Sequence, residues 1–438
     1  MELTAGHVWT FVAAGLVFFM TPGLALFYGG MTRAKGVLNM MMMSFISIAI
    51  VAVVWVLWGA SMSSGDAILG GLVADPTASF GLNGLVGSED LLGSAFGITF
   101  AIITVALISG AIADRTKFGS WVVFTLVWIT AVYFPLSFMV WGGGLWSEGG
   151  ALAEMFGEPI DFAGGLVVHI NAGVAALVLI LLIGARKGFG QDSGQRPHNL
   201  PLVMLGAAIL WFGWFGFNVG AAATAEQAAL IWTNTLVAPA AAMLTWLLTE
   251  KIRDGHATSL GAASGVVAGL VAITPACANV SPLGAIALAA VAGVLSALAV
   301  GMKYKIGLDD SLDVIGVHLV SGIVGTVALG FLAIPSEGEA GLFYGGGWAL
   351  MGAQVTSTVF AVLYTGVLTL IIGMLIKVTM GLRISSQDEV DGIDVTQHAE
   401  SAYSLKDEAT GYFAGTSPAR PLPGTAEAPV HAKEGSSL

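Results

Sequence analysis

Eleven apolar segments, each near the length of about 20 residues that a helix needs to cross a bilayer, follow one another along this chain of 438 residues. Charged residues make up only 10% of the sequence and the mean hydropathy is +0.85, values that exclude an ordinary soluble domain. The sequence therefore predicts an all-α polytopic membrane protein. The predicted membrane helices cover residues 8–30, 39–61, 91–113, 119–142, 162–184, 199–220, 227–249, 257–275, 282–301, 313–334 and 346–379.

The first segment contains Pro22 and is preceded by no Lys or Arg. It lacks the basic start of a cleavable signal peptide, so we expect it to remain in the mature protein. The 60 glycines of the chain favour close packing of membrane helices. The single cysteine, Cys277, excludes an intrachain disulfide and a cysteine-based metal cage.

Lys and Arg occur at alternate connections between the predicted helices, and such residues concentrate on the cytoplasmic side of a membrane. We therefore expect the N-terminus outside and the C-terminus inside. The acidic outer mouth would raise the local concentration of cations, although topology and solubility alone could also account for it. The basic connections hold Arg33, Lys35, Arg115, Lys117, Arg186, Lys187, Arg196, Lys251, Arg253, Lys303, Lys305 and Lys377, and the acidic ones hold Asp66, Asp75, Glu89, Asp90, Glu148, Glu154, Glu158, Asp161, Glu226, Glu337 and Glu339.

Two histidines, His169 and His318, lie inside apolar segments in matching local frames, VHINAG and VHLVSG. They fall on the fifth and tenth predicted helices. Because five is odd, two successive five-helix units have opposite orientations, which is the inverted repeat of many transporters. We expect an inverted 5+5 repeat followed by a long final helix, with the two imidazole rings meeting near the middle of the membrane.

A histidine inside a membrane segment indicates a functional site by default. Burial disfavours the imidazolium form, so we expect two neutral rings that share a hydrogen bond. Three other interpretations stay open at this point: histidines that only pack between helices, axial ligands of a haem iron, and a zinc site, which lacks nearby third and fourth ligands. The sequence also has no phosphate-binding loop that would suggest ATP-driven pumping.

Several local strings resemble signature segments of the Amt/MEP/Rh family of ammonium transporters, and the resemblance runs through most of the chain. It implies eleven helices, a homotrimer with one pore in each subunit, no cofactor, no nucleic-acid partner, and a prokaryotic transporter of ammonium in the cell membrane. The strings are PGLALFYGGM at 22–31, ADRTKF at 113–118, MVWGGGL at 139–145, DFAGGLVVHINAG at 161–173, PHNLPLV at 197–203, GWFGFNVG at 213–220, TPACA at 274–278 and DDSLDVIGVHLVSGIVG at 309–325.

The resemblance also implies roles for individual residues. Trp141, Phe100 and the position of Ala221 would form an outer ammonium site, where ring faces hold a cation by about 0.5–2 kcal/mol. Without the family, Trp141 would be interpreted as an anchor at the membrane interface. Phe100 and Phe217 would form a gate. The remaining pore residues implied by the resemblance are His169, His318, Phe27 and Trp214.

Two features depart from the family pattern. Many members carry Ser where this chain has Ala221, so a hydroxyl acceptor for the ion is missing and the outer site is expected to be weaker. The stretch 146–159 is longer than in some relatives and has no assigned role. Asp161 matches the family, but at eight residues, or about 12 Å along a helix, it cannot touch His169. We expect it to cap the fifth helix and to keep the vestibule favourable to cations.

These features predict that NH4+ is recruited outside, loses a proton at the gate, and crosses as NH3 past the histidine pair, because carrying a full charge through hydrocarbon costs several kcal/mol. An ammonium sensor without net transport is the alternative. A fused signalling domain would favour the sensor, but only about 55 residues follow Arg383.

The predicted division is a transmembrane domain over 1–380, a cytoplasmic segment over 381–404 and a disordered tail over 405–438, rich in Ala, Pro, Ser and Gly. By resemblance, 381–403 packs against neighbouring subunits. A PII-type regulatory protein would dock on this cytoplasmic face.

Overall fold

The structure, a computed structural model, consists almost entirely of helices and describes residues 2–191, 195–335 and 338–403. Within these ranges, ten helical stretches are long and apolar enough to span a membrane. Some contain a short stretch of π-helix or 3₁₀-helix, through which the helix continues. The ten are α1 (Ala5–Met31), α2 to α3 (Val37–Ser63), α4 with η3 (Asp90–Ile112), α5 to α6 (Phe118–Trp141), η5 with α8 (Gly165–Ile183), α9 (Leu200–Val219), α10 (Ala225–Asp254), α12 (Pro282–Ile306), η7 with α13 (Ile315–Leu332) and α14 (Trp348–Thr379).

The eighth predicted segment, 257–275, is shorter than expected. It forms α11 (Ser259–Ile273), a helix of 15 residues, and Pro275 follows in a series of turns. A proline lacks the N–H group that continues a helix and disfavours the helical conformation of the residue before it. The structure thus supports about ten membrane helices, and eleven crossings remain a prediction.

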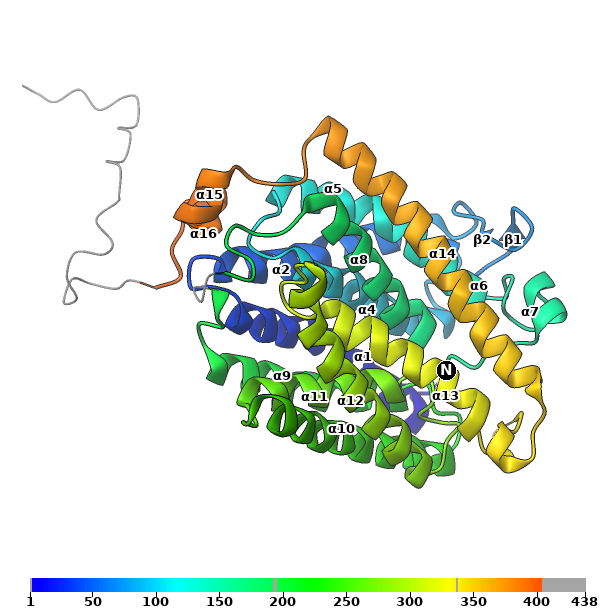
Figure 1. Cartoon of the computed structure of the whole chain (residues 1–438). Helices are drawn as coiled ribbons and strands as arrows, with labels where there is room; N and C mark the ends of the chain where they lie inside the picture. The colour runs from blue at the N-terminus through cyan, green and yellow to red at the C-terminus, as the bar shows by residue number, and fades with distance from the viewer. Residues whose placement is uncertain (1, 192–194, 336–337, 404–438) are drawn as a thin grey trace, which may run out of the picture. The chain divides into compact units, whose positions relative to one another are not determined.

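The connections at one end contain short elements that the sequence did not predict. A two-stranded antiparallel sheet pairs β1 (Ala67–Ile68) with β2 (Val73–Ala74). The unassigned stretch 146–159 contains α7 (Ala151–Phe156), and Trp146 lies with its ring 5.7 Å from that of Phe360 on α14. This stretch therefore packs against the last long helix (Figure 1).

Close packing between α1 and α9 depends on glycines, which have no side chain. A Cβ atom at Gly206 would lie 2.3 Å from the backbone nitrogen of Phe27, and one at Gly23 would lie 2.6 Å from the side chain of Ile209. Small residues let two helix backbones approach in this way. The contact fixes Phe27, which faces the interior with only 3% of its surface exposed.

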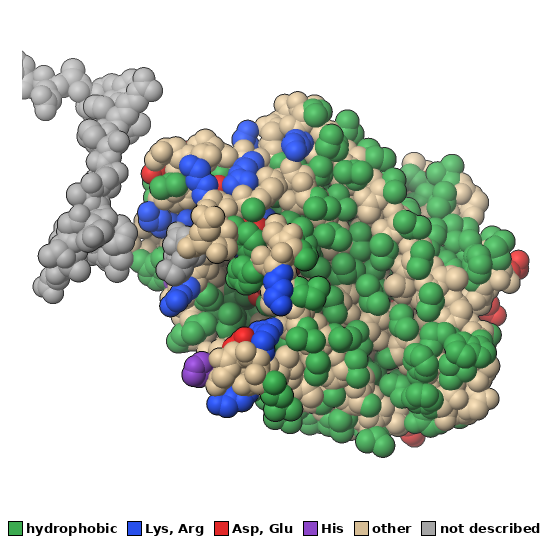
Figure 2. Space-filling view, in the orientation of Figure 1, with side chains coloured by type: hydrophobic (Ala, Val, Ile, Leu, Met, Phe, Trp, Pro, Cys, Tyr) green, Lys and Arg blue, Asp and Glu red, His purple; other side chains and the backbone are tan. Residues whose placement is uncertain are grey.

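Lys and Arg side chains gather at the end of the bundle where α15 (Ser386–Asp391) and α16 (Ile393–His398) lie, as Figure 2 shows. We call this the basic end, defined by the loops that carry Arg33, Arg115 and Arg186. The opposite end, which carries α7, β1 and β2, is called the acidic end (Figure 1).

Buried carboxylates neutralise the arginines of the basic end. Arg186 forms a two-pronged pair with Asp309, with distances of 2.9 and 2.8 Å, and Arg33 lies 3.1 Å from Asp114. Arg115 is fully buried, and desolvation lowers the pKa of its guanidinium to about 10 although Asp309 opposes the shift. These acids stand at connections that the sequence analysis treated only as basic.

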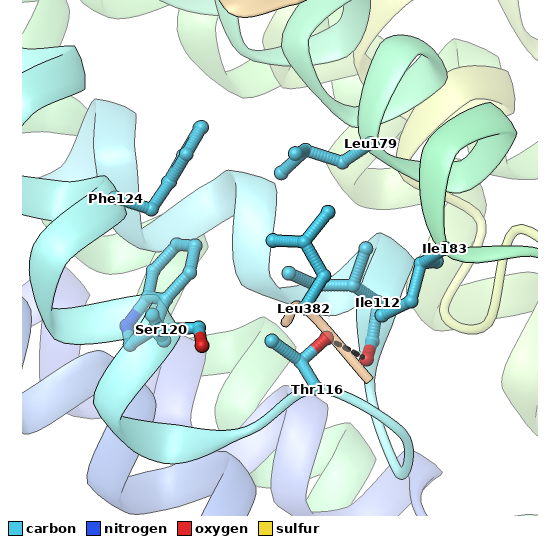
Figure 3. A pocket seen from close by; sticks show the side chains of 8 residues that line it. Ile112, Thr116, Ser120, Phe124, Leu179, Ile183 and Leu382 are labelled. Carbon is cyan, nitrogen blue, oxygen red and sulfur yellow. Dashed lines mark hydrogen bonds between the residues drawn. The ribbon is translucent and has the colours of Figure 1, made fainter. Parts of the chain in front are cut away.

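The segment after α14 attaches to this end through backbone pairing. Ile384 N–H donates to Arg115 O at 3.0 Å, and Lys117 N–H donates to Leu382 O at 2.9 Å. Figure 3 shows the side chain of Leu382 among those that line a small cavity. The other lining residues come from η3, the loop after it, α5 and α8: Ile112, Thr116, Ser120, Trp121, Phe124, Leu179 and Ile183.

The described part of the predicted cytoplasmic segment over 381–404, up to residue 403, thus contains two short helices, α15 and α16, and is attached to the basic end by backbone pairing. The predicted disordered tail over 405–438 lies outside the described residues.

Candidate functional site

The two histidines predicted to meet lie in direct contact. The Nδ1 atoms of His169 and His318 are 3.3 Å apart, and their ring centroids are separated by 5.4 Å at an interplanar angle of 20°. Both residues are buried, with 1% and 3% of their surface exposed. A hydrogen bond at this distance requires one ring to donate and the other to accept.

Both histidines lie in wide helical turns. His169 is in η5 (Gly165–Ile170) and His318 in η7 (Ile315–Val320), and each π-helical stretch leads into an α-helix, α8 (Asn171–Ile183) or α13 (Ser321–Leu332). Such insertions are rare and recur at functional sites. The two helices start at Gly165 and Ile315, later than the predicted residues 162 and 313.

The late start of the fifth helix has a local cause. Gly164 adopts a φ of 117°, which L side chains rarely adopt. The carboxylate of Asp161 accepts the N–H groups of four consecutive residues, 164 to 167. It therefore satisfies the free donors at the start of the helix, as predicted for a capping residue.

The remaining contacts of Asp161 connect it to the acidic end. Its backbone oxygen accepts a hydrogen bond from Trp141 Nε1 at 2.8 Å. Burial raises the pKa of the Asp161 carboxyl to about 6, and the four N–H donors oppose this shift. At neutral pH the group is still mainly a carboxylate.

Glycines four residues after each histidine let the two helices cross closely. A Cβ atom at Gly173 would lie 2.8 Å from the backbone nitrogen of Leu319, whereas one at Gly322 would meet side-chain and backbone atoms no nearer than 3.1 Å. The crossing places Leu319, the residue after His318, directly against the helix that carries His169.

We predict unequal effects for alanine at these two glycines. Gly173→Ala must displace backbone and is expected to destabilise the protein by about 1–3 kcal/mol, the usual cost of overpacking. Gly322→Ala meets only contacts that can shift by a few tenths of an ångström, so its cost should be smaller. Thermal unfolding of the two variants in detergent gives the comparison. Equal midpoints would contradict the close crossing at Gly173.

A continuous row of aromatic rings connects the acidic end with the histidines. The ring of Trp141, which is 39% exposed, lies 6.3 Å from Phe100, and Phe100 stacks on Phe217 at 4.2 Å. Phe217 lies 6.2 Å from His169, and Trp214 stacks on His169 at 5.5 Å. The row passes from an accessible ring to buried ones.

A narrow cavity surrounds the histidine pair, and its wall includes the predicted residues Phe27, Trp214 and Phe217. The aliphatic part of the wall could not be predicted from the sequence, because the same residue types also face lipid. The aliphatic residues of the wall are Met20, Leu24, Ile103, Leu107, Val168, Leu210 and Val267. His169 Nε2 is buried and has no hydrogen-bond partner in the described part of the chain.

Three predicted residues of the outer site and gate, Phe100, Trp141 and Ala221, stand outside this wall. Phe100 and Trp141 are connected to the cavity through Phe217, and Phe96, which the sequence analysis missed, packs on Phe100 at 4.8 Å. Ala221 lies exposed in the turn after α9. Its neighbour Gly220 contacts Phe96, because a Cβ there would lie 2.5 Å from that ring.

The distance between the two histidines and the residues around them argue against the haem and zinc interpretations. A haem iron with two axial histidines needs the porphyrin plane between their nitrogens, and a direct contact of 3.3 Å leaves no space for it. Among residues 2–191, 195–335 and 338–403, no group of three His, Cys, Asp or Glu side chains could hold a metal ion.

Comparison with known proteins assigns the chain to a family. The sequence profile described as "Ammonium Transporter Family" matches residues 8–403. An ammonium transporter of Mycobacterium tuberculosis H37Rv is 51% identical over 430 residues, covering 91% of this chain and 90% of the relative. The ammonium transporter Amt1 of Archaeoglobus fulgidus is 41% identical over 410 residues, covering 92% and 100%.

Solved structures have the same fold. A protein titled "Sensor Amt Protein" superposes with a TM-score of 0.82 at 27% identity, covering 90% of this chain and 98% of that one. Mep2 of Saccharomyces cerevisiae gives a TM-score of 0.79 at 30% identity, covering 88% and 92%.

Proposed function

Because this chain belongs to the ammonium transporter family, a family of multi-pass membrane transport proteins rather than enzymes, we propose that it takes up ammonium and conducts ammonia along the path from Trp141 to the histidine pair. The observation that carries the proposal is the contact of two buried histidines inside a narrow cavity. That cavity is reached along a row of aromatic rings. Polar nitrogens in an apolar passage suit a small neutral molecule that can form hydrogen bonds.

Recruitment takes place at the acidic end. Trp141 offers a partly exposed ring face, and Phe100 stands almost perpendicular to it at 86°. Ring faces attract a cation by about 0.5–2 kcal/mol. Asp161, whose backbone oxygen bonds to Trp141, adds the negative potential of its carboxylate to this vestibule without touching the ion.

The stacked pair of Phe100 and Phe217 closes the path below this site. An ion that passes the stack would lose its water and its contact with the outer rings, which costs several kcal/mol. Ammonium avoids the cost because it can give its proton to water at the acidic end and continue as ammonia. Potassium has no proton to lose, so the same step excludes it.

In the cavity, the histidine pair offers hydrogen bonds to neutral ammonia. His169 Nε2 lacks a hydrogen-bond partner in the described residues and can bond to passing ammonia. The shared contact between the Nδ1 atoms holds the two rings in line. Phe27 and Trp214 belong to the wall around the pair, and Trp214 stacks on His169.

The wider arrangement belongs to the same proposal. It comprises eleven crossings in an inverted 5+5 repeat, an N-terminus outside and a C-terminus inside, in the cell membrane. The transmembrane domain would cover 1–380, followed by a cytoplasmic segment. The gathering of Lys and Arg at the basic end supports this orientation. A homotrimer, and a PII-type regulator at the basic end, are proposed from family membership alone.

Ala221→Ser tests the outer site. A hydroxyl there would accept a hydrogen bond from ammonium, and bonds to charged groups contribute about 1.5–3 kcal/mol. We expect half-saturation at a concentration roughly tenfold lower, measured as methylammonium uptake against concentration. Ala223→Ser, in the same exposed turn, is the matched control. An unchanged concentration dependence would remove position 221 from the site.

A sensor without net transport remains the alternative, because one structural relative carries that title at 27% identity. Relatives named as transporters reach 51%, which favours transport. Methylammonium uptake into proteoliposomes, with current recorded in parallel, decides between the two functions. Absence of flux would reject transport, and flux with current would show that charge crosses as well.

A further inference from the structure

Asp310 stands in the same relation to His318 as Asp161 does to His169. Each aspartate precedes its histidine by eight residues, and each is buried, with 3% and 6% of its surface exposed. Each also accepts N–H groups at the start of a wide-turn helix, and for Asp310 the donor is Ile315 N–H at 2.7 Å. The two aspartates lie at opposite ends of the path.

The backbone before each helix is also similar. Gly164 has a φ of 117° and Asp313 a φ of 64°, so each helix is entered through a residue in the left-handed region. Such a conformation is uncommon for a residue other than glycine. The second histidine-bearing helix is thus built by the same local device as the first.

The two carboxyl groups differ in how many of their oxygens accept hydrogen bonds. Both oxygens of Asp161 accept N–H groups. In Asp310 only Oδ2 does so, and Oδ1 is buried without a hydrogen-bond partner in the described part of the chain. A buried oxygen without a partner is costly, and a bound proton or a donor such as ammonium would satisfy it.

The charged and titratable groups around Asp310 favour proton exchange. Asp313, Lys303, Tyr28 and Arg115 interact with it electrostatically. Lys303 is engaged elsewhere, because its Nζ donates to the carboxylate of Asp313 and to the backbone oxygen of Asp310. Burial, and next the charge of Asp313, raise the pKa of Asp310 to about 6.

Tyr28 interacts both with Asp310 and with residues of the cavity wall. Tyr28, which interacts electrostatically with Asp310, donates its hydroxyl to Leu107 O at 3.0 Å and has its ring 5.8 Å from that of Phe27. Both Leu107 and Phe27 line the cavity around the histidines. Tyr28 thus links the wall of the cavity to Asp310, which interacts with Arg115 and Lys303 of the basic end.

We propose that Asp310 is a proton-exchange site at the inner end of the path, which returns a proton to ammonia as it leaves. This inference rests on the proposed function. The O–H bond of the Asp310 carboxyl breaks as an N–H bond forms on ammonia. Ammonium departs, the carboxylate remains, and a hydronium ion at the basic end gives it a proton and leaves water.

The test compares Asp310→Asn, which cannot titrate, with Asp310→Glu, which can. The full chain is reconstituted in proteoliposomes, and ammonia entry is followed with a lumenal pH dye over a series that spans pH 6. Because the acid form is populated below the pKa, the Asp310-dependent rate should fall as pH rises, about tenfold per pH unit above the inflection. Asp310→Asn should lose this inflection and Asp310→Glu should keep one.

Infrared spectroscopy gives a readout independent of flux. Asp161 is a second buried carboxyl whose pKa is raised to about 6, so two protonated-carboxyl bands should titrate in the unaltered protein. Asp310→Asn should lose one of these bands and keep the other. Asp391→Asn, exposed at the same end, should change neither readout. If the Asn variant fails to fold, the Glu variant carries the test. The inflection of the rate against pH and the titration of one protonated-carboxyl band should then shift together in Asp310→Glu.

The outcomes separate the two proposals. An Asn variant that keeps the inflection and both bands would overturn the role of Asp310 and leave transport standing. Absence of ammonia entry in every variant, including the unaltered chain, would overturn the proposed function and the exchange step with it.

Discussion

Replacing His169 or His318 with alanine is expected to slow ammonia conduction at least about tenfold or to admit potassium. Each ring supplies the polar atoms of an otherwise apolar cavity, and losing hydrogen bonds worth about 1.4 kcal/mol in the barrier slows a step tenfold. The vacated volume could instead fill with water and conduct ions. Stopped-flow ammonia entry and potassium current in the same proteoliposomes distinguish these results.

His256→Ala is the matched control, because His256 is exposed in a loop at the basic end and should leave both measurements unchanged. A double His169→Ala, His318→Ala variant should add little to either single change if the rings act as one unit. Ammonium flux and selectivity that are unaltered in both single variants would refute the path through the histidines.

Asp161→Ala is expected to be the most destabilising single change. It leaves four backbone N–H groups without their acceptor at the start of the helix that carries His169. Each buried donor left unpaired costs about 1–3 kcal/mol, so the total should be at least about 4 kcal/mol. This is a large part of the 5–15 kcal/mol that typically stabilises a protein.

Thermal unfolding in detergent and the yield of folded protein measure the effect. Asp161→Asn keeps one acceptor oxygen and should lie between the alanine variant and the unaltered protein. Glu154→Gln, exposed on α7, is the control at the same end. A melting curve for Asp161→Ala equal to that of the control would show that the carboxylate does not hold the helix.

Much of this arrangement could be predicted from the sequence. The repeated frame around His169 and His318 predicted their contact, since equivalent positions in two similar helices meet where those helices cross. The apolar runs predicted nearly all the long helices. The short α11 was missed because hydrophobicity continues through Pro275, where the backbone turns although the composition does not change.

Other features could not be found in this way. A wide helical turn leaves no pattern of residue types, so the late starts at Gly165 and Ile315 were invisible. The aliphatic wall of the cavity has the composition of a lipid-facing surface. Asp309 and Asp310 were visible only as part of the family string at 309–325, because charge counting gives topology and not which carboxylate is paired.

The backbone pairing of Leu382 with Lys117 has a practical consequence for where the folded unit ends. A chain cut after the last long helix would lose a side chain from the wall around Ile112, Phe124 and Leu179 (Figure 3). It would also expose the unpaired N–H of Lys117. Shortened versions intended for purification should therefore retain residues up to the end of α16. Otherwise they will expose apolar side chains and an unpaired N–H group at the basic end.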